Sequence, residues 1–152
     1  ATGAGGPASA TGLGGSASAT GWGGSASATG EQGSASATGE QGSASATGSG
    51  GSASATGERG SAIATGERGS ASATGVNGIA AITTEYSTVE TKDGMAASTA
   101  QRFYWKVHQG AVLTCRWKDG ENIRFKSSIA PSDCYEKTVK IQDGEIVKSF
   151  SN

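Results

Sequence analysis

Residues 51–75 read GSASATGERGSAIATGERGSASATG, a nine-residue unit repeated almost without change. The unit is G-S-A-S-A-T-G-x-x, in which the x-x pair varies, and Ile63 stands where the neighbouring copies have Ser. The phase holds back to the first residues of the chain, because every copy carries Thr followed by Gly. These threonines are Thr2, Thr11, Thr20, Thr29, Thr38, Thr47, Thr56, Thr65 and Thr74. Such strict periodicity predicts a stacked repeat architecture.

Other interpretations of this low-complexity half remain open. A flexible Gly/Ser linker has the same composition and buries too little apolar surface to offset the entropy of ordering. A solvated linker, however, has no reason to keep Thr-Gly in register through nine copies, whereas a stacked structure must do so. A trimer that shares one rod, or a bundle of Gly-rich extended helices, also fits the repeat.

Each repeat predicts one strand and one turn. Ser-Ala-Ser-Ala-Thr alternates as a strand does, and G-x-x-G indicates a bend. Two units would close a coil of about 18 residues and form a flat β-roll, in which each strand pairs with its equivalent in the next coil. We therefore predict an all-β fold with a nonapeptide-repeat β-solenoid over residues 1–78. Four coils at about 4.8 Å per coil give a rod on the order of 20 Å long.

The inner face of these strands is left open by the residues. With Ala inside, the interior is thin and close-packed and the hydroxyl groups face water. With Ser and Thr inside, hydroxyl ladders fill the interior and flat Ala faces lie outside.

The segment SAIATG at 61–66 resembles the S-V-A-I-G unit in the head repeats of trimeric autotransporter adhesins. The nonapeptide is also similar to A-T-G-rich repeats of phage-borne and bacterial surface fibre proteins, and the resemblance covers residues 51–82. It implies a β-roll. Because the Ile of the adhesin unit points inward, it also implies that Ile63 is a buried core plug. The bulky Ile79 and Ala81, at the same repeat positions, lead to the same expectation.

The remainder of the chain follows different rules. Residues 79–100 keep the strand pattern with bulkier side chains, which predicts a transition or capping segment. Residues 101–152 hold most of the charge and aromatic residues and alternate apolar with polar side chains. Asp-Gly lies between strand-like runs in KDGEN (118–122) and QDGE (142–145), which is a strong hairpin signal. We predict a small antiparallel β domain over 101–152.

The sequence holds few candidates for chemistry. His108 is the only histidine, so any nucleophilic dyad or triad that needs an imidazole must use it. Cys115 shares a predicted apolar face with Leu113, and a buried thiol or a disulfide with Cys134 is expected. Two Cys and one His give no zinc spacing, and the repeat lacks the Asp of calcium-binding β-rolls. We expect no enzyme, no metal site and no cofactor.

Charge and hydropathy limit the classes of partner that the chain can bind. The formal net charge is −1, so no positive field attracts nucleic acid, and no apolar stretch is long enough for membrane insertion. We expect an extracellular, cell-surface or virion fibre, stalk or spike segment that associates with itself as a homotrimer or filament, or with other fibre or virion components. The alternatives are an ice-binding protein, and a glycan-binding adhesin that uses Tyr104 or Tyr135 of the C-terminal domain. The sequence does not indicate a host. Because Ala1 lies within a repeat, a processed start and a truncated start both remain open.

Overall fold

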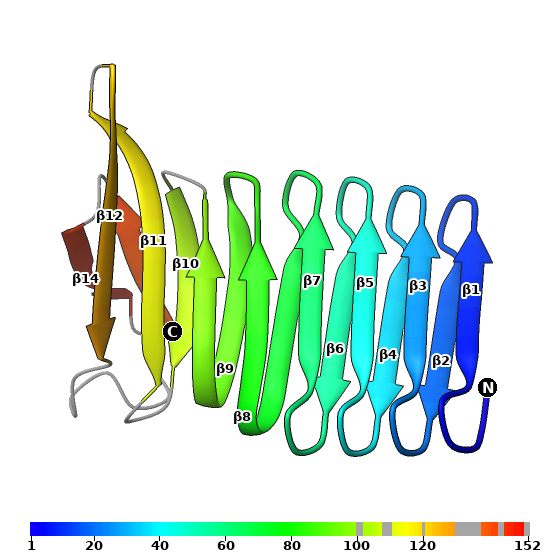
Figure 1. Cartoon of the computed structure of the whole chain (residues 1–152). Helices are drawn as coiled ribbons and strands as arrows, with labels where there is room; N and C mark the ends of the chain where they lie inside the picture. The colour runs from blue at the N-terminus through cyan, green and yellow to red at the C-terminus, as the bar shows by residue number, and fades with distance from the viewer. Residues whose placement is uncertain (100–101, 108–110, 120, 130–137, 143–144, 151–152) are drawn as a thin grey trace.

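The computed structural model describes residues 1–99, 102–107, 111–119, 121–129, 138–142 and 145–150 (Figure 1). Within these ranges the chain is all-β, without a helix. Successive strands wind into about six stacked turns of a flat β-solenoid, and the strands alternate between two sheets. The predicted fold class is therefore confirmed.

Every complete repeat up to Thr65 forms one short strand. The seven strands are β1 (Pro7–Thr11), β2 (Ser16–Thr20), β3 (Ser25–Thr29), β4 (Ser34–Thr38), β5 (Ser43–Thr47), β6 (Ser52–Thr56) and β7 (Ser61–Thr65). Each strand from β1 to β6 pairs in parallel with the strand two places on, as Ser25 does with Ser43. The predicted coil of about 18 residues is correct, because two repeat units are needed before an equivalent strand returns to the same side.

The two sides of the coil will be called the odd and the even sheet. The odd sheet begins with β1, β3, β5 and β7, and the even sheet begins with β2, β4 and β6. Strands β8 (Ser70–Ile82) and β9 (Ser87–Ser98) are long enough to run along both sheets in turn. Strand β8 pairs first with β6 through Ser52 and Ser70, and then with β7 through Ser61 and Ile79.

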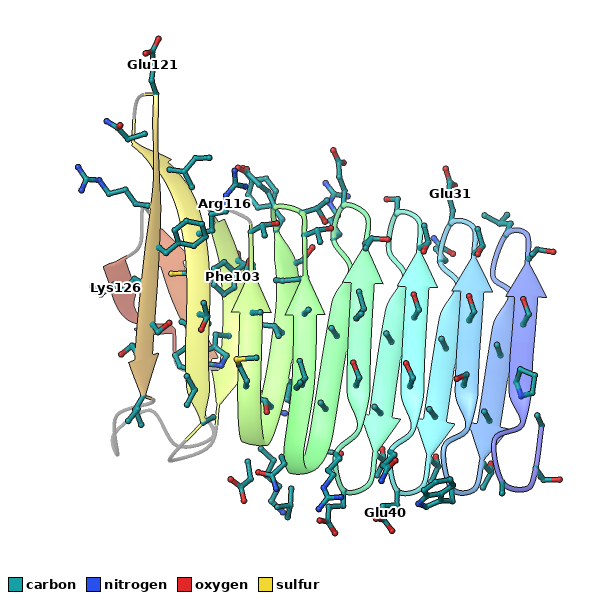
Figure 2. All side chains as sticks on the ribbon, viewed as in Figure 1. Glu31, Glu40, Phe103, Arg116, Glu121 and Lys126 are labelled. Atoms are coloured by element: carbon teal, nitrogen blue, oxygen red, sulfur yellow. The ribbon has the colours of Figure 1, made fainter. Side chains whose placement is uncertain are left out.

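The turns between strands are hydrogen-bonded in two directions. Within one turn, the N–H of Gly51 donates to the carbonyl of Gly48 (3.2 Å), as expected of a four-residue β-turn. Between coils, the N–H of Gly48 donates to the carbonyl of Thr65 (2.8 Å). The turns therefore extend the parallel ladders around both edges of the solenoid. Glu31 and Glu40 mark turns at opposite edges (Figure 2).

The repeat interior is made of alanine. Both alanines of each strand from β2 to β7 are buried, and Ala37, Ala46 and Ala55 have no exposed surface. The serines point outward, and the expectation that Ile63 is a core plug is wrong, because its side chain is 39% exposed on the outer face of β7. With Ala inside, the two sheets of the repeat pack closely and the repeat hydroxyl groups stay outside, where water can bind them.

The interior becomes wider toward the C-terminus. Ile82 of β8 and Val89 of β9 are the first large buried side chains, and they are followed by Phe103, Trp105 and Leu113. These larger side chains fill more volume between the two sheets than Ala does. Phe103 is seen among these strands in Figure 2.

The parallel stack continues beyond residue 100. Strand β10 (Arg102–Val107) pairs in parallel with the even-sheet half of β9, and β11 (Val112–Asp119) pairs in parallel with its odd-sheet half. The structure thus differs from the expectation that residues 101–152 are purely antiparallel. The alternating pattern of RFYWKV suits both kinds of pairing, since both put successive side chains on opposite faces.

Antiparallel strands cover the last coil. Strand β12 (Asn122–Ile129) pairs with β11, and β13 (Thr138–Gln142) pairs with β10 and with β14 (Glu145–Phe150). The pairings Asp119 with Asn122 and Gln142 with Glu145 confirm the two predicted hairpins. In Figure 1, the hairpin of β11 and β12 extends past the edge of the coils.

Candidate functional surfaces

The even sheet carries an unbroken array of hydroxyl groups. The outward side chains of β2, β4, β6 and the start of β8 are Ser, Ser and Thr in each strand. In-register pairing aligns these residues in three columns: Ser16, Ser34, Ser52 and Ser70; Ser18, Ser36, Ser54 and Ser72; Thr20, Thr38, Thr56 and Thr74. The spacing is about 4.8 Å across strands and about 6.6 Å along each strand.

The odd sheet has the same array with two interruptions. Pro7 begins β1 where the next strands have Ser, and Ile63 replaces the middle Ser of β7. The Thr column is intact here, and Thr65 donates a hydrogen bond to Thr47 across adjacent strands (3.3 Å between the Oγ1 atoms). The nine repeat threonines therefore line up as two columns, Thr2 to Thr74 on one side of the coil and Thr11 to Thr65 on the other.

Beyond β7 the two sheets present different chemistry. On the even sheet, Lys106 of β10 forms an ion pair with Glu90 of β9 (3.2 Å), and Ser72 of β8 donates to the same carboxylate (3.4 Å). On the odd sheet, the first outward column turns apolar and consists of Ile79, Met95, Val112 and Ile129. This apolar column was not predicted, because Ile79 was counted toward the interior.

A groove lies beside the apolar column. It has a volume of about 410 Å³ and is lined by Asn77, Gly78, Ile79, Asp93, Gly94, Met95 and Val112. Gly78 and Gly94 face each other in adjacent strands. Neither glycine can carry a side chain without a clash, because a Cβ on Gly94 would meet the backbone of Gly78, and a Cβ on Gly78 would lie 3.0 Å from the Cβ of Ala73. Met95 comes two positions earlier in the chain than the repeat phase would place the partner of Ile79, which hid this column from the periodic pattern.

Of the two cysteines in the predicted disulfide, one lies in the described part of the chain. Cys115 is buried in β11 with a free thiol, and Cys134 lies outside the described residues, so the disulfide stays a prediction. Burial raises the pKa of the Cys115 thiol, and the nearby positive charge of Lys126 acts in the opposite direction. A buried thiol with a raised pKa is a poor nucleophile at neutral pH.

Of the other predicted residues, Tyr104 lies in the described part of the chain. Tyr104 lies on the outer side of β10 in the even sheet, where it is 37% exposed. Tyr135 and His108 lie outside the described residues.

The described residues contain no group of three or more His, Cys, Asp or Glu placed to hold a metal ion. They also contain no helix long and apolar enough to cross a membrane. Comparison of the chain with protein-family models, with curated proteins and with solved structures finds no match.

Proposed function

We propose that this chain is a structural segment of a fibre, stalk or spike, exposed on a cell surface, in the extracellular space or on a virion. The in-register stack of two-repeat coils supports this proposal most directly. Strands and turns are hydrogen-bonded from coil to coil, and a continuous ladder of this kind resists bending and stretching. The larger side chains and antiparallel strands at residues 101–152 serve as a cap or tip that can contact other components of the assembly.

The N-terminal end of the stack, formed by β1 and β2, is a possible place for self-association. Among the described strands, β1 pairs only with β3 and β2 only with β4. The Thr20 end of β2 is already bonded to Ala1 and Thr2, so the edges that further coils could extend are β1 and the Ser16 end of β2. Such coils can come from the same polypeptide or from another copy. Open edges of this kind readily add strands.

Pro7 weakens this edge on the odd sheet. From β3 on, the first Ser of each repeat strand donates its N–H to the preceding coil, as Ser25 does to the carbonyl of Gly6 (3.2 Å). Pro7 occupies the equivalent position in β1 and has no N–H to donate. Proline on an edge strand is a known means of limiting strand addition. We therefore expect end-to-end stacking to be held in check by this one residue.

Restoring the missing donor tests the proposal. Pro7→Ser is expected to lengthen end-to-end assemblies, because each junction gains one ladder hydrogen bond worth about 1 kcal/mol. Ser16→Pro removes the equivalent donor from β2 and is expected to shorten them. Rod length by negative-stain electron microscopy and mass by light scattering measure both effects, and circular dichroism confirms the fold. Identical compact monomers for the wild type and both variants would contradict stacking through this edge.

Ice binding is a second candidate function, and the unbroken hydroxyl array of the even sheet favours it. A rigid, flat lattice of hydroxyl groups can hold ordered water at fixed spacing, as a crystalline surface requires. The odd sheet lacks this regularity because of Pro7 and Ile63.

The two sheets provide a matched test of ice binding. Thr38 and Thr29 occupy the same repeat position on the even and odd sheets, and both are exposed. If the even sheet binds ice, Thr38→Lys is expected to abolish inhibition of ice recrystallisation, whereas Thr29→Lys leaves it unchanged. A wild-type protein without effect on ice-crystal growth would exclude this candidate.

A further inference from the structure

Exposed large apolar side chains occur at turns and corners, such as Leu13 and Trp22, but those on the sheet faces are concentrated on one side of the solenoid. Six of them lie on the outer face of the odd sheet, namely Ile63, Ile79, Met95, Ile123, Phe125 and Ile129. On the outer face of the even sheet, Tyr104 is the one exposed large apolar side chain among the described residues. The apolar residues occupy β7, β8, β9, β11 and β12, which are neighbours in the sheet. A contiguous one-sided apolar patch is typical of an interaction surface.

Strand pairing fixes the orientation of β12 in this patch. Thr114 of β11 and Ser127 of β12 are opposite each other, and their hydroxyl oxygens are 3.0 Å apart on the outer face. Val112 and Ile129 are opposite in the same register, two residues away, and so share that face. The apolar column therefore runs without a break over four adjacent strands.

The column and the groove complement each other within one chain. Ile129 is 67% exposed at one end of the column and does not line the groove, which lies beside Ile79, Met95 and Val112. A two-fold axis parallel to the strands reverses the order of the strands in a second copy. Ile129 of each copy then lies opposite Ile79 and its groove, and Met95 lies opposite Val112.

We infer that the odd sheet binds a second copy of this chain, as an isologous dimer in which the two solenoids point in opposite directions. A two-fold axis along the stack, centred on the middle column of Ala81 and Ala97, would instead reverse the strands and place the apolar column on the polar Thr83 and Thr99. A trimer would need two different complementary surfaces on each copy, and the other sheet is charged at this level. The dimer joins the capped ends, so the repeat coils extend away on both sides.

The size of the apolar patch determines how strongly we expect the dimer to associate. Four strands at about 4.8 Å and about 20 Å of strand length give about 380 Å² per copy and about 770 Å² in total. Stable interfaces bury about 1,200 Å² or more, and weaker ones bury less. We therefore expect a dimer that forms and dissociates over an accessible range of protein concentration.

Two pairs of substitutions on the same two strands test this pairing, which rests on the proposed self-association. Ile79→Lys with Met95→Lys places charges in the first outward column of the odd sheet. Ser70→Lys with Thr88→Lys places them in the first outward column of the even sheet, on β8 and β9 again. All variants carry Ser16→Pro, which limits end-to-end stacking, and circular dichroism checks the fold. Sedimentation velocity over a dilution series gives the mass.

The chain that carries Ser16→Pro alone, called the parent, and the even-sheet variant are expected to reach twice the monomer mass. The odd-sheet variant is expected to dimerise at least about tenfold more weakly, because each copy buries two charges without partners. Ile129→Lys is expected to weaken the dimer in the same direction. An odd-sheet variant that dimerises like the parent, or a trimer mass, overturns this interface but leaves the proposed fibre intact. A wild-type chain that is monomeric at every concentration, without Ser16→Pro, overturns both.

Discussion

Gly48→Ala is expected to lower the free energy of unfolding by at least about 3 kcal/mol. Gly48 has a φ of +129°, a region that is essentially restricted to glycine. A Cβ on Gly48 would also lie 2.6 Å from the carbonyl carbon of Gly30 in the preceding coil. Neither backbone can move away alone, because the N–H of Gly30 is bonded to the carbonyl of Thr47 (2.8 Å). Urea unfolding followed by far-ultraviolet circular dichroism measures the loss.

Gly50→Ala in the same turn is the matched control. Gly50 has a φ of +70°, and a Cβ there would contact only the Cγ atom of Gln32, at 3.5 Å. The equivalent turn position holds Gln41 and Arg59 in other coils, with φ near +60°. The left-handed conformation alone costs a non-glycine residue about 1 kcal/mol, so the control is expected to lose that much and no more. Equal losses for the two variants would show that crowding between coils is not the cause.

The coil could be predicted from the repeat because the strand register follows directly from the length of the repeat unit. Each unit supplies one strand and one turn, so an equivalent strand returns after two units, and Thr-Gly fixes where the turn begins. From Gly21 to Gly75, the Gly after each Thr approaches the preceding coil as closely as Gly48 does, whereas Gly3 and Gly12 share only the positive φ. A side chain at this position would meet the backbone of the coil below, and the sequence accordingly keeps Gly at this point.

The inner face could not be predicted from the same pattern. Ala and Ser differ by one oxygen atom, so alternation of the two gives a far weaker hydropathy contrast than alternation of Leu and Lys. The resemblance to adhesin repeats decided the expectation for Ile63, and that expectation was wrong. The structure shows Ser45 and Ile63 side by side on the outer face, where a hydroxyl and a larger apolar group are both accommodated.

The apolar patch escaped prediction for a different reason. Strand β9 pairs Thr88 with Ser70 near its start, in phase with the repeat, but it pairs Met95 with Ile79 near its end. The second pair is closer in the chain than the first, because the corner of β9 between the sheets is shorter than the corner of β8. Met95 therefore lies beside Ile79 although the nonapeptide phase places it elsewhere. Pairing between strands, rather than spacing along the chain, brings these residues together.

Ala46→Ile is expected to lower the free energy of unfolding by about 3 kcal/mol, the upper end of the usual cost of overpacking. Ala46 has no exposed surface, and the same column continues with Ala28 and Ala64 in the coils on either side. Both sheets are tied into ladders along their whole length, so they cannot separate at one coil without breaking turn hydrogen bonds. Thermal unfolding by circular dichroism and calorimetry measures the change.

Ser45→Ile, one residue earlier, is the control that separates side-chain size from position. Ser45 lies next to Ile63 on the outer face, so the added isoleucine gains contact with an existing one and meets no opposing sheet. Its effect is expected to stay within about 0.5 kcal/mol, as for most surface substitutions. If Ser45→Ile proved as costly as Ala46→Ile, the serines would have to face the interior. Since the natural chain already carries Ile at the equivalent position of the next coil, an outward-facing serine column is the arrangement consistent with a 39% exposed Ile63.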